Sequence, residues 1–500
     1  MMHFKSATGM RLSLIGALVL ILCASGCRSS SFQQRRQVSL GEIYDDLAQL
    51  PDTERNPVIV IPGILGSKLV DDKTGEVVWG EMGPRDVSAL RTRSLTELSL
   101  PMQLGVPLSQ LRDDVRQDGP LDKAVFHILG IPIKVNAYAQ LLASLGVGGY
   151  RDEHFKGASG FNEVNYGDDH FTCFQFAYDW RRDISESAAL LDQYIKEREQ
   201  YTREQYRVRY GIENPNIKFD IVAHSMGGMV ARYYMRYGSQ PLPEDGSLPV
   251  LNWAGAQHVG RVFLVGTPNL GSTKAVEEMK EGITLAAPLP KFPAAVVGTI
   301  PAAYQLLPRN QDFPLVTSEG VPLDLFSPET WQGLEWGLAE PAQDRKLRRL
   351  LPNCSREQRM QIALEHQAKC LARASQLHRA LDLKAELPQG IEMHLYAGDA
   401  EKTLHQLVVN PNNGRITQKN ETAGDGTVTR TSALSERRSS QTHRHLQRII
   451  PWTNETFLSA DHLGLTKDRT FVDNVLDQLT SRPQTTMQFH FSDSPQTIER

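Results

Sequence analysis

Residues 217–228 constrain the fold of this chain more than any other stretch. A β-rich run leads to Ser225, and apolar residues at helical spacing follow it directly. A strand that turns sharply into a helix strains the turning residue, so the residues two before and two after it must be small. Those positions hold Ala223 and Gly227. The pattern predicts a nucleophilic serine whose following helix directs its N-terminus at a reacting carbonyl.

β-rich runs and helical patterns alternate along the rest of the chain. This alternation favours an α/β fold with a mostly parallel central sheet and helices on both faces. About 440 residues follow the N-terminal segment, which is ample for one large domain with insertions. Strands are expected at residues 57–61, 171–178, 217–222, 261–265 and 391–396, and helices at 138–145, 187–201, 229–237 and 471–479.

The first 27 residues have the organisation of an export signal. Lys5 and Arg11 precede an apolar run at 12–23, which is too short to span a bilayer as a stable helix. The run ends in Ala-Ser-Gly-Cys, which is similar to a bacterial lipobox and predicts that Cys27 is lipidated. The alternative is ordinary signal cleavage near Gly26, which leaves a soluble periplasmic protein.

The two ends of the remaining chain are polar. Residues 28–56 lack a strong pattern and are predicted to tether the anchor to the domain at 57–480, and residues 481–500 form a polar tail. Together with the signal, this organisation predicts a protein of the bacterial cell envelope. We expect a lipid anchor to hold it on the outer membrane, facing the periplasm.

Charge and cysteine content exclude several classes of function. The formal charge is -4 over 500 residues and no basic cluster suggests nucleic-acid binding, so no nucleic-acid partner is expected. The sequence has no His/Cys cluster at metal-binding spacing and no phosphate-cradling loop, so neither a metal nor a cofactor is expected. Cys173 is expected to be a buried thiol. Cys354 and Cys370 bracket a helical segment of an exported protein, which makes a disulfide between them possible.

A serine nucleophile needs a base and an orienting acid, in the chain order Ser, Asp, His for this kind of turn. His462 lies in a loop just before the last expected helix, where the base belongs. Two acids are candidates. Asp399 follows the strand expected at 391–396, and Asp425 lies in a glycine turn; spacing alone does not decide between them. The other late histidines lie in a basic polar run or in the tail: His443, His445 and His490.

Five motifs, taken together, resemble the lecithin:cholesterol acyltransferase family, which includes lysosomal phospholipase A2 and phospholipid:diacylglycerol acyltransferases. The resemblance extends from about residue 57 to about residue 479. It implies an α/β-hydrolase fold, Asp425 rather than Asp399 as the acid, and the His462–Leu463 pair as the site of the base. The motifs are Pro-Val-Ile-Val-Ile-Pro-Gly-Ile-Leu-Gly at 57–66, Tyr-Asp-Trp-Arg at 178–181, Ala-His-Ser-Met-Gly at 223–227, Gly-Thr-Pro-Asn-Leu-Gly-Ser at 266–272 and Gly-Asp-Gly-Thr-Val at 424–428.

Acyl transfer also requires two backbone N–H groups that converge on the developing oxyanion. One is expected from Met226, the residue after the nucleophile. The resemblance implies Ile64 as the other, in a loop where Gly63 and Gly66 allow close approach of the backbone. An ordinary turn at the end of a strand is the alternative interpretation of this loop.

A large insertion at about 273–385 has no clear counterpart in the family. Residues 283–308 are apolar and proline-rich, which favours either a lid that meets acyl chains or a packed insertion. Residues 345–383 are expected to form a basic amphipathic helical pair.

Two functions follow from these observations. The first is a serine O-acyltransferase or phospholipase that cleaves a membrane phospholipid or related ester and passes the acyl group to an alcohol or to water. The second is a non-catalytic envelope lipoprotein that uses the fold as a lipid-binding or interaction module. The Ser225, Asp425 and His462 set, in the correct order, favours the first.

Overall fold

A computed structural model gives the fold of this chain. It describes residues 39–80, 97–121, 124–128, 131–135, 138–154, 170–283, 292–309, 313–438 and 446–481. Cys27, His443, His445 and His490 lie outside the described residues. Contacts divide the chain into two units, residues 1–43 and residues 44–500. Of the first unit only residues 39–43 are described, where helix α2 (Leu40–Ala48) begins.

The second unit is built on a six-stranded sheet with the order β16-β11-β9-β8-β1-β7. Every neighbouring pair in it is parallel. All residues of β1, β8 and β9 are buried, as expected for strands covered on both faces. The expected α/β fold is confirmed. The strands are β1 (Val58–Ile61), β7 (Cys173–Gln175), β8 (Phe219–His224), β9 (Val259–Val265), β11 (Glu392–Gly398) and β16 (Asn454–Leu458).

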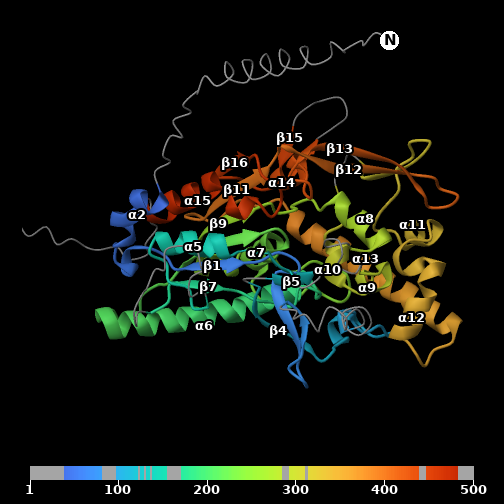
Figure 1. The fold of residues 1–500 in the computed structure, drawn as a ribbon, viewed down its shortest axis with the longest axis horizontal. Coiled ribbons are helices and arrows are strands. Elements are labelled where there is room, and N and C mark those ends of the chain that lie inside the picture. The colour runs from blue at the N-terminus through green and yellow to red at the C-terminus, as the bar shows by residue number, and fades with distance from the viewer. Residues whose placement is uncertain are drawn as a thin grey trace, which may run out of the picture. The chain divides into compact units, whose positions relative to one another are not determined.

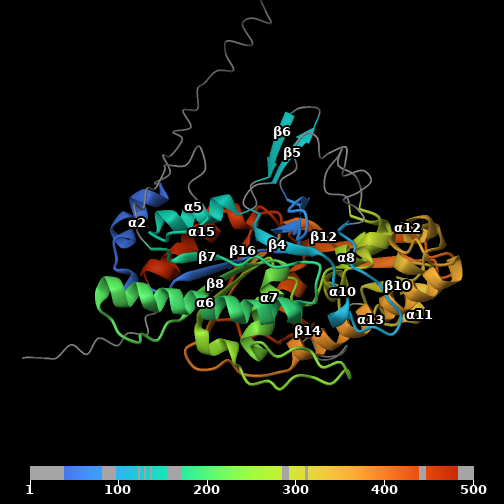
Figure 2. The ribbon, with the colours of Figure 1, turned by 90° about the horizontal axis from the view of Figure 1, so that it is seen from below.

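Helices cover both faces of this sheet. Figures 1 and 2 show α5 and α15 on one face and α6 and α7 on the other, and each pair is in mutual contact. α6 begins at an Asp183 cap and ends at Gly211, whose φ of 65° is left-handed. The bounds are α5 (Ala139–Val147), α6 (Ile184–Tyr210), α7 (Met226–Tyr237) and α15 (Arg469–Leu476).

The insertion between β9 and β11 consists mainly of helices. The expected helical pair is present as α12 and α13, and α13 begins with a capping box between Ser355 and Gln358. Within the described part of the chain, none of the helices is both long enough and apolar enough to span a membrane. The elements are α8 (Thr273–Glu281), α9 (Ala294–Val297), α10 (Pro301–Gln305), β10 (Leu315–Thr317), α11 (Pro328–Gly333), α12 (Asp344–Leu350) and α13 (Arg356–Asp382).

Smaller sheets and one short helix complete the unit. β10 joins a hairpin in the order β10-β12-β13, and β2 lies between β3 and β4. Two further pairs are β5 with β6 and β14 with β15. The bounds are β2 (Ser67–Asp71), β3 (Val77–Trp79), β4 (Val115–Pro120), β5 (Ala124–Ile128), β6 (Ile131–Val135), β12 (Glu401–Val409), β13 (Ile416–Gly424), α14 (Arg430–Leu434), β14 (Glu436–Arg438) and β15 (Leu446–Arg448).

The apolar insertion is packed into the protein core over residues 292–307. Phe292, Val296 and Tyr304 are at most 5% exposed and belong to the main hydrophobic cluster. Phe292 also makes an edge contact with Trp79. The packed-insertion alternative therefore describes this part, whereas residues 284–291 lie outside the described residues. Movement of the segment as a lid stays a prediction.

The tether prediction is wrong for residues 44–56. Asp52, Arg55 and Asn56 are each at most 6% exposed. The Arg55 guanidinium donates to the Gly148 carbonyl oxygen at 2.6 Å, and Asp52 pairs with Arg151. The polar residues nearest the domain, Asp52, Arg55 and Asn56, are therefore buried and hydrogen-bonded rather than part of a solvated linker.

The possible Cys354–Cys370 disulfide is also wrong. Cys173, Cys354 and Cys370 are all free, and Cys173 is buried as expected. Cys354 lies just before α13 begins at Arg356, and Cys370 lies inside that helix. At about 1.5 Å of rise per residue, the two are separated by roughly 20 Å along the axis. A disulfide requires Cα atoms less than about 7 Å apart.

Candidate active site

Ser225 occupies the strained turn that the sequence predicts. It lies between β8 and α7 with φ 53° and ψ -127°, a conformation that is costly for a residue with a side chain. Close packing around the turn holds Ser225 in this conformation. A Cβ on Gly227 would lie 2.4 Å from the Pro62 carbonyl oxygen, and one on Gly228 would lie 2.0 Å from the Thr267 hydroxyl. The small residues therefore let α7 begin directly against the ends of β1 and β9.

The structure brings Ser225, His462 and Asp425 into one hydrogen-bonded row. His462 Nε2 lies 2.9 Å from Ser225 Oγ, and His462 Nδ1 lies 2.8 Å from Asp425 Oδ2. The other carboxylate oxygen of Asp425 accepts from the backbone N–H groups of Thr427 and Val428 at 2.9 and 2.7 Å. Asp425 is 2% exposed, so its orientation is fixed by the turn that contains it.

Asp399 lies elsewhere. Its carboxylate accepts from the Arg430 guanidinium at 2.5 Å, a partly exposed pair. Of the two candidate acids, the structure places Asp425 beside His462, and this is the residue that the family resemblance implies. Its role as the orienting acid stays a prediction. Spacing left the choice open because each acid directly follows a strand, Asp399 after β11 and Asp425 after β13.

The expected oxyanion loop lies beside Ser225. A Cβ on Gly63 would come within 2.8 Å of Ser225 Cβ, so only glycine fits at this position. Gly66 N–H donates to the Gly63 carbonyl oxygen at 3.1 Å, which closes the turn. Ile64 follows Gly63 in this turn. Met226 is the first residue of α7, where backbone N–H groups have no partner within the helix. Their role as oxyanion donors stays a prediction.

Sequence reasoning missed a second buried row formed by Tyr138 and His224. The Tyr138 hydroxyl accepts from Gly63 N–H at 2.8 Å and lies 2.9 Å from His224 Nδ1. His224 Nε2 lies 3.0 Å from the His462 carbonyl oxygen. Burial lowers the pKa of His224 to about 3, so its imidazole is neutral. The only signal for this row was the histidine before Ser225 in the Ala-His-Ser-Met-Gly motif.

The directions of these hydrogen bonds follow from their partners. A carbonyl oxygen only accepts, so His224 carries its proton on Nε2 and leaves Nδ1 as an acceptor. Burial raises the pKa of Tyr138, which keeps its proton and donates it to Nδ1. The row therefore ties the Gly63 backbone to the backbone of His462.

A pocket of about 380 Å³ opens at Ser225 and His462. Its wall is mostly apolar, which suits a hydrocarbon chain. The insertion contributes part of that wall although it is packed into the core. The apolar residues include Ile64, Leu65, Met279, Val297, Ala303 and Leu306.

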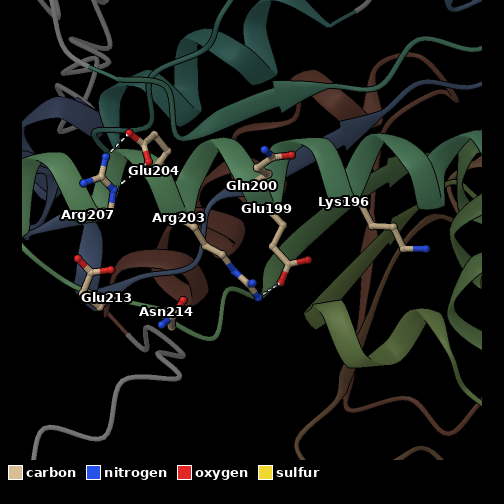
Figure 3. A pocket seen from close by; sticks show the side chains of 8 residues that line it. All are labelled: Lys196, Glu199, Gln200, Arg203, Glu204, Arg207, Glu213 and Asn214. Carbon is tan, nitrogen blue, oxygen red and sulfur yellow. Dashed lines mark hydrogen bonds and ion pairs between the residues drawn. The ribbon is translucent and has the colours of Figure 1, made fainter.

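A second hollow, of about 430 Å³, lies on α6 and the turn that follows it. Figure 3 shows that charged and amide side chains line it. Arg203 pairs with Glu199, and Arg207 pairs with Glu204 at 2.7 Å. Among the described residues that line it there is no serine or cysteine, so the chemistry of the Ser225 pocket outweighs that pocket's slightly smaller volume.

A family model described as "Lecithin:cholesterol acyltransferase" matches residues 160–416, just over half of the chain. The chain belongs to the lecithin:cholesterol acyltransferase family. The matched range contains Ser225 and the motif at 178–181. Asp425 and His462 lie beyond it and are placed by geometry alone.

Two solved structures resemble this family member. One is described as "The crystal structure of Tle4-Tli4 complex"; it is 15% identical with a TM-score of 0.50, over 86% of this chain and 100% of that chain. The other is EstA from Clostridium botulinum, 14% identical with a TM-score of 0.31, over 88% and 91%. At this low sequence identity, the first structure shows a shared fold but not a shared activity or substrate. A comparison with curated protein sequences found no match.

Proposed function

We propose that this protein is a serine-dependent lipid acyltransferase or phospholipase that works through an acyl-enzyme on Ser225. The hydrogen-bonded row of Ser225, His462 and Asp425 at the mouth of an apolar pocket carries the proposal. Family membership supports a lipid acyl ester as the substrate. The non-catalytic alternative gives no reason for a nucleophile, a base and an acid to align at 2.9 and 2.8 Å.

Each group has a role in this mechanism. Ser225 Oγ attacks the ester carbonyl while His462 Nε2 takes its proton, and the oxyanion accepts hydrogen bonds from the N–H groups of Ile64 and Met226. His462 then returns the proton to the departing alcohol as the C–O bond breaks. Water or a second alcohol repeats these steps on the acyl-enzyme and releases Ser225. Asp425 holds the imidazole in the tautomer with its proton on Nδ1.

Product analysis on phospholipid vesicles tests this function. Vesicles with a radiolabelled acyl chain are incubated with the protein, with and without an added alcohol such as 1-octanol. We expect labelled fatty acid without the alcohol, and labelled octyl ester in addition when it is present. An absence of both products in the presence of a folded wild-type protein would favour the non-catalytic binding module.

We also propose that the protein is a bacterial lipoprotein anchored through Cys27. Two or three acyl chains at this cysteine would hold the enzyme firmly at the membrane that supplies its substrate. Replacing Cys27 with serine is expected to release the protein into the soluble periplasmic fraction or leave it unprocessed. Mass spectrometry of the mature N-terminus checks this, and an unmodified N-terminus beyond residue 27 would contradict it.

The Tyr138–His224 row gives a prediction for the rate of the reaction. Tyr138→Phe removes the partner of both Gly63 N–H and His224 Nδ1 and so loosens the loop that contains Ile64. We expect kcat to fall about 10-fold to 100-fold, with a smaller change in KM. The measurement is steady-state hydrolysis of a soluble nitrophenyl ester.

Tyr201→Phe is the matched control for this variant. The Tyr201 hydroxyl on α6 also accepts a backbone N–H, from Phe171 at 3.0 Å, but Tyr201 does not line the pocket. Both variants should lose similar stability in urea denaturation, whereas only Tyr138→Phe should lose kcat. If kcat is equal in the two variants, the Tyr138–His224 row has a structural role only.

A further inference from the structure

Helix α12 presents a basic face to solvent. Residues 344–359 contain six basic and two acidic residues, a net charge of +4, whereas the whole chain has a formal charge of -4. Arg345, Arg348 and Arg349 recur at helical spacing on α12 and are all exposed. Arg356, the first residue of α13, is exposed as well. These four arginines are called the α12 patch below.

The acidic residues of this region do not neutralise the α12 patch. Asp344, the single acid of α12, accepts from the Arg359 guanidinium at 2.8 Å, which holds the starts of α12 and α13 together. The Glu357 carboxylate accepts from the Ser355 hydroxyl at 2.9 Å. Among the residues that the structure describes, no acidic side chain forms an ion pair with an arginine of the patch.

Helix electrostatics account for half of the patch. Arg348 and Arg349 lie in the last turn of α12, where a cation is favourable. Arg345 lies in the first turn of α12, and Arg356 lies in the first turn of α13, where the helix dipole makes a cation unfavourable. Neither the dipoles nor an ion pair explains these two arginines, which favours an anion from outside the chain as their partner.

The opposite face of α12 joins the patch to the wall of the Ser225 pocket. Leu347 is fully buried in a cluster that includes Ala295 of α9. The backbone N–H of Ala295 also donates to Gln343, the residue before α12, at 3.3 Å. Val297, which ends α9, lines the pocket. Figures 1 and 2 show α12 at the outer edge of the insertion, so its basic face is free to meet a surface.

We propose that the α12 patch docks on a lipid surface that contains anionic phospholipids. Lipid phosphates supply the negative charge that this region of the chain lacks, and a guanidinium matches the geometry of a phosphate. Each arginine near such a surface strengthens binding by roughly five-fold. The inference rests on the proposed function, because a lipid ester as substrate is what brings the enzyme to a lipid surface.

Mixed micelles separate this docking from the choice of substrate. Dioleoyl phosphatidylcholine is the substrate, at a fixed fraction in a nonionic detergent. The anionic lipid is a diether phosphatidylglycerol, which has no ester that could be cleaved. We expect it to lower the apparent KM of the wild type about ten-fold at low salt, and we expect most of this effect to disappear at about 0.5 M salt. A lipid anchor would be common to all the proteins and micelles compared.

The test variant removes three charges of the patch: Arg345→Gln, Arg348→Gln and Arg349→Gln together. We expect it to lose the ten-fold response to the anionic lipid and to hydrolyse soluble 4-nitrophenyl butyrate at the wild-type rate. The matched control removes three charges from α6, each of which already has an acidic partner. It should keep the wild-type response, and it combines Lys196→Gln, Arg203→Gln and Arg207→Gln.

Several results would overturn the docking. One is a wild type that does not respond to the anionic lipid, and another is an equal response in the wild type and the α12 variant. An equal loss in the α12 and α6 variants would show an effect of net charge alone. Binding of labelled single-stranded DNA through the same arginines, without a response to lipid, would assign the patch to a nucleic acid instead.

Failure of the proposed function gives a different result, because a folded wild type would then hydrolyse no ester at all. Docking is in that case measured by co-sedimentation with diether phosphatidylcholine vesicles, with and without the diether phosphatidylglycerol. A gain on the anionic vesicles for the wild type, but not for the α12 variant, would support docking without acyl transfer. Equal gains for the two proteins would overturn the docking as well.

Discussion

Replacing Ser225 with alanine is expected to lower lipid ester turnover by a factor on the order of 10⁴–10⁶. The substitution removes Ser225 Oγ, which lies 2.9 Å from His462 Nε2 in the position of a nucleophile. Without it no acyl-enzyme forms, and only the oxyanion donors and the pocket remain. Initial rates of fatty acid release from phospholipid vesicles measure the effect.

Ser239→Ala is the control for this variant, because Ser239 is exposed and follows the end of α7. It should retain full activity. Ser225→Ala should keep the wild-type circular dichroism spectrum, since alanine meets the same backbone strain at φ 53° as serine does. Substantial turnover by a folded Ser225→Ala protein would show that another group carries the acyl chain.

Asp425→Asn is expected to lower kcat by about 10⁴-fold, whereas Asp399→Asn should change it by only a few-fold. The asparagine carbonyl oxygen can still accept from the Thr427 and Val428 N–H groups, so the turn is preserved. Its amide faces His462 Nδ1 as a donor, which forces the imidazole into the wrong tautomer. The base is then present but cannot take the serine proton.

Asp399→Asn provides the comparison within the same assay. It weakens a partly exposed ion pair with Arg430, and such pairs contribute little to the stability of the fold. Initial rates of nitrophenyl ester hydrolysis rank the two variants. The opposite ranking would overturn the assignment that the family resemblance implies and the geometry supports.

The sheet and the nucleophile turn could be predicted from the sequence because both depend on local patterns. Alternating β and helical periodicity is enough for a parallel α/β fold. A strand, a serine between small residues and a helix are enough for the turn at Ser225. Local patterns could not identify the orienting acid, because Asp399 and Asp425 both follow strands. Only the family resemblance or the structure separates them.

The features that the sequence did not reveal depend on distant contacts. Residues 44–56 are polar, yet Asn56 donates to Asp220 at 3.2 Å, 164 positions along the chain. The Tyr138–His224 row joins segments 86 positions apart. Composition also could not decide whether the apolar insertion is a mobile lid or a packed wall of the core, because both require apolar residues. The Cys354–Cys370 expectation failed because nearly all of the segment between the two cysteines is one continuous helix, which holds them roughly 20 Å apart instead of folding back to bring them together.

Acid quenching of the reaction, followed by peptide mass spectrometry, tests the central claim most directly. The wild-type protein is mixed with vesicles that contain an oleoyl phospholipid, stopped within the first turnover and digested. For the wild type we predict one oleoyl group, attached to the peptide that contains Ser225. For the Asp425→Asn variant, in which acylation is slow, we predict no oleoyl group at the same time point. Turnover without this adduct, or with the oleoyl group on another residue, would contradict an acyl-enzyme on Ser225.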